Sequence, residues 1–282
     1  MIKKLSVVLF LFASFFVFAD EAVLIDFSKL SADTAIDFSS YATGFTLTNP
    51  KVSLEAKNWN VDFNASANTL EASIKSYTLP ASSKANGTVL GVRAFFPSTP
   101  AHAFVLPPYQ IPAYSSVDFS GNGVLRNVGT IKEVKVTVYG HNVDYRFYIV
   151  LQDQTGKTWD VDMGSLQFTG WRELVWTNAG YIADVRDREI TVTPSYPGNM
   201  TYVRLVGFKI TKSMSSPGGD FITYIKSVSM IYDKASLDTD TDIDDEAIWS
   251  LSKEKKNESD LELQRAASLL YLREQEALLM TK

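Results

Sequence analysis

The pattern of apolar and polar positions between residues 23 and 232 is that of many short β-strands. Ile131–Tyr139 shows it most clearly, because Val134, Val136 and Val138 alternate with polar or larger side chains. An alternation with a period of two is typical of a strand that buries one face. Turns rich in glycine and proline separate the runs, and no helical pattern alternates with them. We therefore predict a single all-β sandwich or jelly roll.

The other predicted strands share a short length, an enrichment in β-branched and aromatic residues, and flanking turn residues. They are Val23–Phe27, Trp59–Phe63, Leu70–Tyr77, Thr88–Phe96, Arg146–Leu151, Thr158–Met163, Trp171–Thr177, Glu189–Thr193, Thr201–Thr211 and Phe221–Tyr232. The fifth and sixth of these runs are separated by the turn Asp153–Gly156, which predicts a hairpin. The sandwich domain is expected to span residues 20–233.

The pattern changes after Tyr232. Six of the nine residues in Asp238–Glu246 are acidic, so we expect residues 234–246 to form a solvated acidic linker. Residues 247–282 lack glycine and proline and are rich in good helix formers, which predicts an amphipathic helix. This helix either packs on its own sandwich or docks on a partner, and the sequence leaves both open. A partner would contact Trp249, Leu263, Ala267, Leu270 and Leu278.

The first nineteen residues have the features of a secretory signal peptide. Lys3 and Lys4 precede the apolar run Leu5–Phe18, and Ala19 offers a small residue for cleavage. The fourteen apolar residues are too few to span a membrane comfortably. We therefore predict export with cleavage after Ala19, and no membrane insertion of the remaining chain.

Composition argues against several kinds of site. The chain has no cysteine, so disulfides, thiol nucleophiles and cysteine-ligated metals are excluded. Its two histidines, His102 and His141, leave little room for histidine-based metal sites or proton relays. The net charge of −5 argues against nucleic acid as a partner. An exported chain without cysteine suits a bacterial periplasm, and we expect no cofactor.

The acidic run resembles part of a calcium-binding loop. Asp238, Asp240 and Asp242 match the start of an EF-hand loop. Ile243 then stands where glycine makes the sharp turn, and Trp249 stands where a glutamate closes the site. We therefore expect no specific metal site in this run.

Asp160 and Asp162 alternate on one predicted strand, so both carboxylates can lie on one side of it. A pair of carboxylates is the minimum that glycosidase chemistry needs, which keeps this alternative open. The chain has no G-x-S-x-G elbow, no H-E-x-x-H helix and no phosphate-binding loop. We expect the protein not to be an enzyme.

Three tryptophans, Trp159, Trp171 and Trp176, lie close together in sequence on predicted strands. An exposed indole ring can stack on a sugar, whereas an inward-facing one fills the core between two sheets. Both interpretations remain open. The exposed arrangement would form a glycan platform, and the alternative function is then a secreted or periplasmic carbohydrate-binding module.

Several segments carry a family resemblance: Ile131–Gly140, Tyr148–Gly156, Gly164–Leu174, Val203–Ile210, and Ile231–Lys234 with the acidic stretch up to Trp249. Together they resemble the flagellar filament outer-layer, or sheath, protein family of spirochetes. The segment Gly170–Leu174 is also similar to galactose-binding-like carbohydrate modules. The fold class expected is therefore a jelly-roll, galactose-binding-like β-sandwich with a C-terminal α-helix.

The resemblance implies a location and a role. A member of this family would be a structural subunit of the outer layer of periplasmic flagellar filaments. It would coat the flagellin core and tune the stiffness and curvature of the filament for motility. The partners implied are the flagellin core filament and neighbouring sheath subunits. The resemblance implies no catalytic residues, and its export by the general secretory route agrees with the N-terminal leader.

Overall fold

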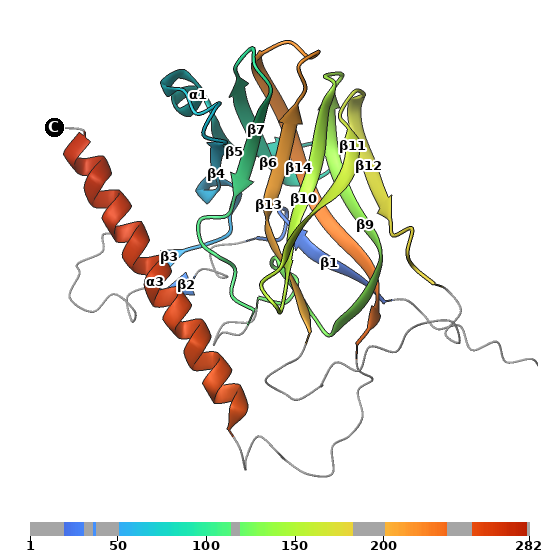
Figure 1. The fold of residues 1–282 in the computed structure, drawn as a ribbon, viewed down its shortest axis with the longest axis vertical. Coiled ribbons are helices and arrows are strands. Elements are labelled where there is room, and N and C mark those ends of the chain that lie inside the picture. The colour runs from blue at the N-terminus through green and yellow to red at the C-terminus, as the bar shows by residue number, and fades with distance from the viewer. Residues whose placement is uncertain are drawn as a thin grey trace, which may run out of the picture.

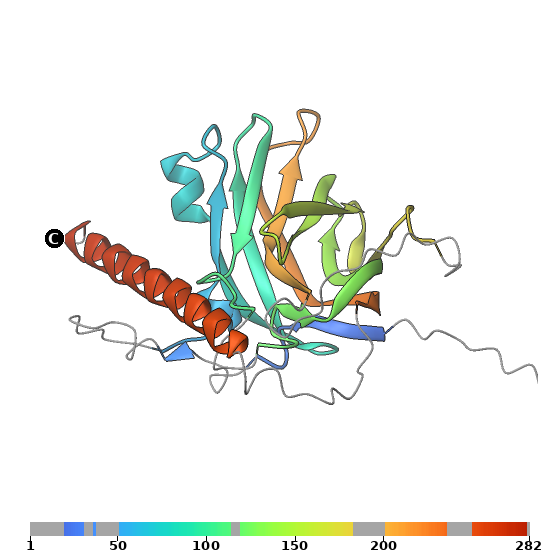
Figure 2. The ribbon, with the colours of Figure 1, turned by 60° about the horizontal axis from the view of Figure 1, so that its bottom comes forward.

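The computed structural model describes residues 20–30, 36–37, 51–113, 119–182, 201–235 and 250–280. Two six-stranded antiparallel sheets form a β-sandwich, as predicted (Figures 1 and 2). The first sheet contains β1 (Asp20–Asp26), β5 (Tyr77–Ser83), β6 (Gly87–Phe96), β9 (Val128–His141), β12 (Thr169–Thr177) and β14 (Gly219–Lys234). The second contains β4 (Asn60–Phe63), β7 (Ala101–Leu106), β8 (Val124–Arg126), β10 (Tyr145–Asp153), β11 (Thr158–Ser165) and β13 (Tyr202–Lys212).

Each sheet is organised around one central strand. The first has the order β12-β9-β14-β6-β5, with β1 also paired to β14, and is called the β14 sheet here. The second has the order β11-β10-β13-β7-β4, with β8 also paired to β13, and is called the β13 sheet. The smaller elements are β2 (Ile36–Asp37), β3 (Lys51–Val52), the 3-10 turn η3 (Ala56–Asn58) and the helix α1 (Leu70–Lys75).

The inner sides of the two sheets form one hydrophobic core. The alternation predicted for β9 is confirmed, because Val134, Val136 and Val138 are fully buried. Phe208 of β13 lies near the middle of an aromatic group in this core. Its ring stacks on Trp59 and on Phe147, with centroid distances of 5.7 Å in both cases. The core therefore joins segments that lie far apart in the chain.

The strand predicted at Leu70–Tyr77 is wrong in its larger part, because residues 70–75 form the helix α1. The side-chain oxygen of Thr69 accepts a hydrogen bond from the backbone N–H of Ala72 at 3.1 Å, which caps the first turn. Lys75 forms an ion pair with Glu71 one turn earlier, at 2.6 Å. The following strand, β5, begins only at Tyr77.

Two strands of the β13 sheet were not expected from the sequence. Ala101–Leu106 forms β7, which pairs with both β13 and β4. Val124–Arg126 forms the short β8, which pairs with one end of β13. The strand predicted at Glu189–Thr193 lies outside the described residues.

A long helix, α3 (Leu251–Met280), lies along the side of the sandwich that carries β2, β3 and β4 (Figures 1 and 2). It confirms the helix predicted near the C-terminus. Leu263 and Ala267 are each only 2% exposed and belong to the core cluster. Within the described part of the chain, no helix has the length and apolar character needed to cross a membrane.

Candidate functional site

A row of aromatic side chains crosses the outer side of the β14 sheet. Trp171 of β12 pairs with Tyr139 of β9, and Tyr139 pairs with Tyr224 of β14. Trp171 and Tyr139 meet edge to face at 5.4 Å, and Tyr139 and Tyr224 do so at 5.8 Å. Such contacts between rings of neighbouring strands are favourable and fix the ring orientations. His141 lies against this row, with its ring 4.9 Å from that of Tyr139.

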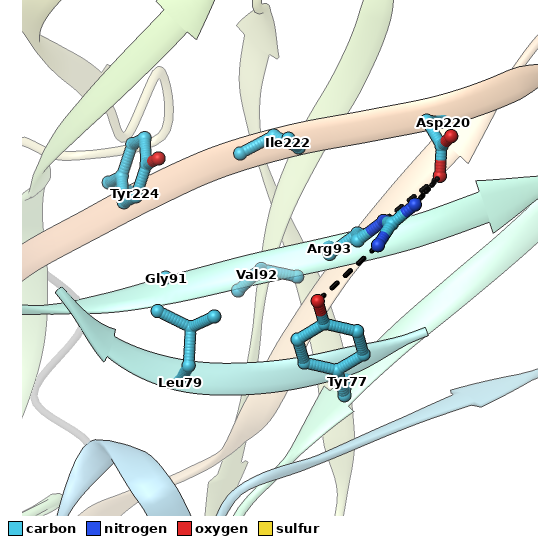
Figure 3. A pocket seen from close by; sticks show the side chains of 8 residues that line it. All are labelled: Tyr77, Leu79, Gly91, Val92, Arg93, Asp220, Ile222 and Tyr224. Atoms are coloured by element: carbon cyan, nitrogen blue, oxygen red, sulfur yellow. Dashed lines mark hydrogen bonds and ion pairs between the residues drawn. The ribbon is translucent and has the colours of Figure 1, made fainter. Parts of the chain in front are cut away.

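The line of cross-strand partners continues from Tyr224 across β6 and β5, where a pocket of about 220 Å³ lies (Figure 3). Tyr224 pairs with Gly91 of β6, and Gly91 pairs with Leu79 of β5. Side chains from three strands therefore surround the depression. They are Tyr77, Leu79, Gly91, Val92, Arg93, Asp220, Ile222 and Tyr224. We call this depression the β14-sheet pocket.

The floor of the β14-sheet pocket is open because residue 91 is glycine. A Cβ atom at Gly91 would lie 3.1 Å from the carbonyl oxygen of Leu79 and 3.3 Å from a ring carbon of Tyr224. Both distances are tighter than ordinary van der Waals contacts. The missing side chain thus leaves the space between Leu79 and Tyr224 that forms one end of the pocket.

A hydrogen-bonded polar group forms the other end of the pocket (Figure 3). Arg93 donates from Nε to Asp220 Oδ1 at 3.0 Å, and its second terminal nitrogen lies 2.9 Å from the same oxygen. Arg93 also donates to the hydroxyl of Tyr77 at 3.3 Å. The hydrogen bonds that Arg93 donates to Tyr77 and to Asp220 raise the pKa of Arg93. Because the ion pair is partly exposed, its main effect is to fix the orientation of both side chains.

The three predicted platform tryptophans do not lie on one face. Trp159 pairs with Leu151 on the inner side of the β13 sheet, and Trp176 pairs with Val134 on the inner side of the β14 sheet. Both are half-buried and pack against the core. Trp171 alone of the three belongs to the outer aromatic row. The pocket residues were not predicted from the sequence, although alternation along β14 already puts Asp220, Ile222 and Tyr224 on one side.

The two candidate carboxylates, Asp160 and Asp162, lie on the outer side of the β13 sheet, where the predicted alternation puts them. Each has a basic partner on the same face. Lys209 lies 2.7 Å from Asp160, and Arg146 lies 2.5 Å from Asp162. The hydrogen bond and charge of Asp162 raise the pKa of Arg146. The arrangement is that of a salt-bridged sheet surface, on the opposite side of the molecule from the aromatic row.

The two histidines lie on different sheets. His102 of β7 lies with Nδ1 3.1 Å from the hydroxyl of Thr211, and burial and then the charge of Lys209 lower its pKa. His141 belongs to the aromatic row of the β14 sheet. The described residues contain no group of three or more side chains suited to hold a metal ion. The acidic residues Asp238, Asp240 and Asp242 lie outside the described residues.

The inner side of α3 is attached to the sandwich through a buried cation. Arg204 of β13 is 6% exposed. It donates to the side-chain oxygen of Gln152 at 2.6 Å and to the carbonyl oxygen of Ile111 at 3.3 Å. Its guanidinium also lies 3.9 Å from the carboxylate of Glu262 on α3. The predicted partner residues Leu263 and Ala267 are therefore covered by this chain itself.

The opposite side of α3 also carries leucines. Leu261 and Leu272 are 52% and 56% exposed. At 100° per residue, Leu261 lies about 200° around the helix from Leu263. The helix is thus apolar on its covered side and on part of its exposed side. Of the other predicted partner residues, Trp249 lies outside the described residues, as do the side chains of Leu270 and Leu278.

The similarity of this chain to known proteins extends over most of its length. A profile of the family described as flagellar filament outer layer protein FlaA matches residues 19–241. A flagellar filament outer layer protein of Spirochaeta aurantia is 35% identical, with 94% of this chain and 88% of that protein covered. One from Treponema pallidum is 36% identical, with 85% and 83% covered. The solved structure of TmCBM61 with β-1,4-galactotriose has 8% identity and a TM-score of 0.31, with 62% and 88% covered.

Proposed function

Because the chain belongs to the family of flagellar filament outer layer proteins, we propose that it is a structural subunit of the outer layer of periplasmic flagellar filaments. In this role it coats the flagellin core and contacts neighbouring subunits of the same layer. The observation that carries the proposal is the match of the family profile over residues 19–241, which includes both sheets. The role is mechanical and requires no catalysis.

The architecture suits a coat subunit. The two sheets share one core, and α3 is fixed to one side of them by buried contacts. A closely packed interior resists deformation, so a layer of such units adds bending stiffness to the filament it covers. Each subunit needs only modest contacts, because many contacts repeated along a filament bind far more tightly than one. Unequal contacts around the filament would bias its curvature.

We assign one of these contacts to the exposed leucines of α3. Leu261 and Leu272 lie about 20° apart around the helix axis, so they form one stripe. Both are more than half exposed. Burying a leucine side chain stabilises an interface by roughly 1.5–3 kcal/mol. The stripe can therefore bind a flagellin or a neighbouring subunit while the opposite side of α3 stays packed on the sandwich.

The proposal includes export. The leader Lys3–Ala19 would direct the chain to the general secretory route, and cleavage after Ala19 would release it into the periplasm. Asp20, the next residue, begins β1. Cleavage there would leave the described sandwich intact, with its first strand at the new N-terminus. N-terminal sequencing of the protein isolated from cells tests this step.

Co-sedimentation with filaments tests the main proposal. Filaments from a strain that lacks the protein are mixed with the full-length protein purified from its own cells. We expect the protein to pellet with the filaments and to widen them in electron micrographs. Leu261→Asp should weaken pelleting, whereas Lys157→Ala, a change at an exposed turn residue, should not.

The same strain supplies a second readout. Loss of the protein should reduce filament diameter, change filament curvature and impair swimming. If the protein stays in the supernatant and the strain keeps normal filaments and motility, the outer-layer role is excluded.

A further inference from the structure

We propose that the β14-sheet pocket binds one ring of a neutral saccharide. This inference goes beyond the role as a coat subunit and does not depend on it. It rests on three observations: the side walls of the pocket, the polar group at one end, and the size of the depression. Each of them matches a different property of a sugar ring.

The side walls match the apolar side of a sugar. Tyr224 stands at one end of the pocket, and Leu79 and Ile222 flank it from β5 and β14 (Figure 3). Leu79 and Ile222 are 41% and 40% exposed, so their side chains remain free to contact a ligand. A pyranose ring has one side formed by C–H groups, which pack favourably on aromatic and aliphatic surfaces.

The polar end matches the hydroxyl edge of a sugar. The guanidinium of Arg93 supplies N–H donors, and Asp220 supplies carboxylate acceptors directly beside them. Two neighbouring hydroxyls can accept from the first and donate to the second. Arg93 engages Oδ1 of Asp220, and no side chain within the described parts of the chain bonds to Oδ2. This oxygen is therefore available as an acceptor.

The same ion pair selects for a neutral ligand. The positive charge of Arg93 is compensated by Asp220 at 2.9 Å. An acidic sugar would place its carboxylate beside that of Asp220, and like charges at such a distance repel. A neutral sugar meets no such penalty. The pocket therefore favours a hexose or an N-acetylhexosamine over a uronic acid.

The size of the pocket limits the ligand to one ring. Its volume of about 220 Å³ is below the ~300–1,000 Å³ that is usual for drug-sized ligands. Gly91 makes this volume possible, because a methyl group there would enter the space between Leu79 and Tyr224. A shallow site for one ring implies weak binding, with a Kd of about 1 mM. Repetition along a filament would strengthen it.

A titration with simple glycosides tests the proposal. The full-length protein, without filaments, is titrated with the methyl glycosides of glucose, galactose, mannose and N-acetylglucosamine, and with methyl glucuronide. Saturation-transfer NMR measures binding. We expect at least one neutral glycoside to bind and the glucuronide to bind about tenfold more weakly or not at all.

Three variants locate the site. Tyr224→Ala, Asp220→Asn and Gly91→Ala should each weaken binding about tenfold or more, while Tyr148→Ala, on the outer side of the β13 sheet, should leave it unchanged. Thermal unfolding of each variant shows whether it is folded. The saccharide assignment is wrong if no neutral glycoside binds, if the glucuronide binds as well as the neutral sugars, or if the folded pocket variants bind like the unchanged protein.

Discussion

Arg204 is a buried cation whose partners come from separate parts of the chain. Gln152 of β10 and the carbonyl of Ile111 accept its hydrogen bonds, and Glu262 of α3 lies within ion-pair distance. A buried charge is stable only when such partners surround it. Arg204 therefore connects the β13 sheet, the segment after β7 and the C-terminal helix through a single side chain.

We expect Arg204→Leu to lower the free energy of unfolding by about 2–5 kcal/mol, because the buried acceptors of Gln152 and Ile111 lose their donor. Chemical denaturation measures the change. Arg172→Leu is a matched control, since Arg172 is exposed on β12. Equal stability of the two variants would show that the contacts of Arg204 contribute little.

Tyr145 gives the protein a predictable response to alkaline pH. Its hydroxyl donates to the carbonyl oxygen of Pro217 at 2.6 Å, and burial raises its pKa. The neutral form is thus favoured in the folded state, so its contribution is complete below the unfolded pKa of about 10 and is lost as pH rises further. Tyr145→Phe should make the fall in stability above about pH 10 shallower. Unfolding curves at several pH values provide the measurement.

At the scale of secondary-structure elements, α3 is apolar on two sides. Leu263 is buried against the sandwich, while Leu261, two positions earlier, is 52% exposed. The sequence pattern predicted one apolar face for this helix. The exposed leucines depart from that pattern, and packing within one chain does not explain them.

The two leucines allow a matched comparison. Leu263→Asp should detach α3, because an unpaired carboxylate cannot remain in the core. Limited proteolysis should then remove α3 rapidly and leave the two sheets as a resistant fragment. Leu261→Asp should leave the proteolysis pattern unchanged. Equal cleavage rates for both variants would contradict the packing described for α3.

The elements that the sequence predicted well are those whose own alternation decides their structure. β9 is one, since Val134, Val136 and Val138 fix its buried face. α1 was missed because capping by Thr69 outweighed the apolar content of the segment. β7 was missed because it is short and lies between Pro100 and Pro107, so that its pairing with β13 and β4 was not visible locally.

At the scale of the whole molecule, aromatic contacts in the core join strands that lie far apart in the chain. Phe208 stacks on Trp59 and Phe147, and its ring also lies 6.4 Å from that of Phe27. Phe208→Ala should therefore lower the free energy of unfolding by about 3–5 kcal/mol. Phe104→Ala, a change on the outer side of β7, should have a much smaller effect. Denaturant titrations of both variants measure the difference.

The aromatic row and the pocket belong to this larger scale, which explains why the sequence did not reveal them. Trp171, Tyr139 and Tyr224 meet only through the register of three strands that are not consecutive in the chain. A pattern of two-residue alternation assigns each side chain to a face but gives no partner on the next strand. The inward placement of Trp159, in contrast, follows from alternation alone, because Asp160 and Asp162 take the other face of the strand.

The strands at the centre of both sheets come last in the sandwich. β13 pairs with β7, β8 and β10, and β14 pairs with β1, β6 and β9. Each of these two strands therefore joins strands that precede it in the chain into one sheet. A chain that emerges N-terminus first, from a ribosome or a translocation channel, therefore cannot close the β13 sheet until about residue 212 has emerged, or the β14 sheet until about residue 234 has emerged. Such a chain can pass through a narrow channel unfolded for most of its length, and the two sheets form only near the end.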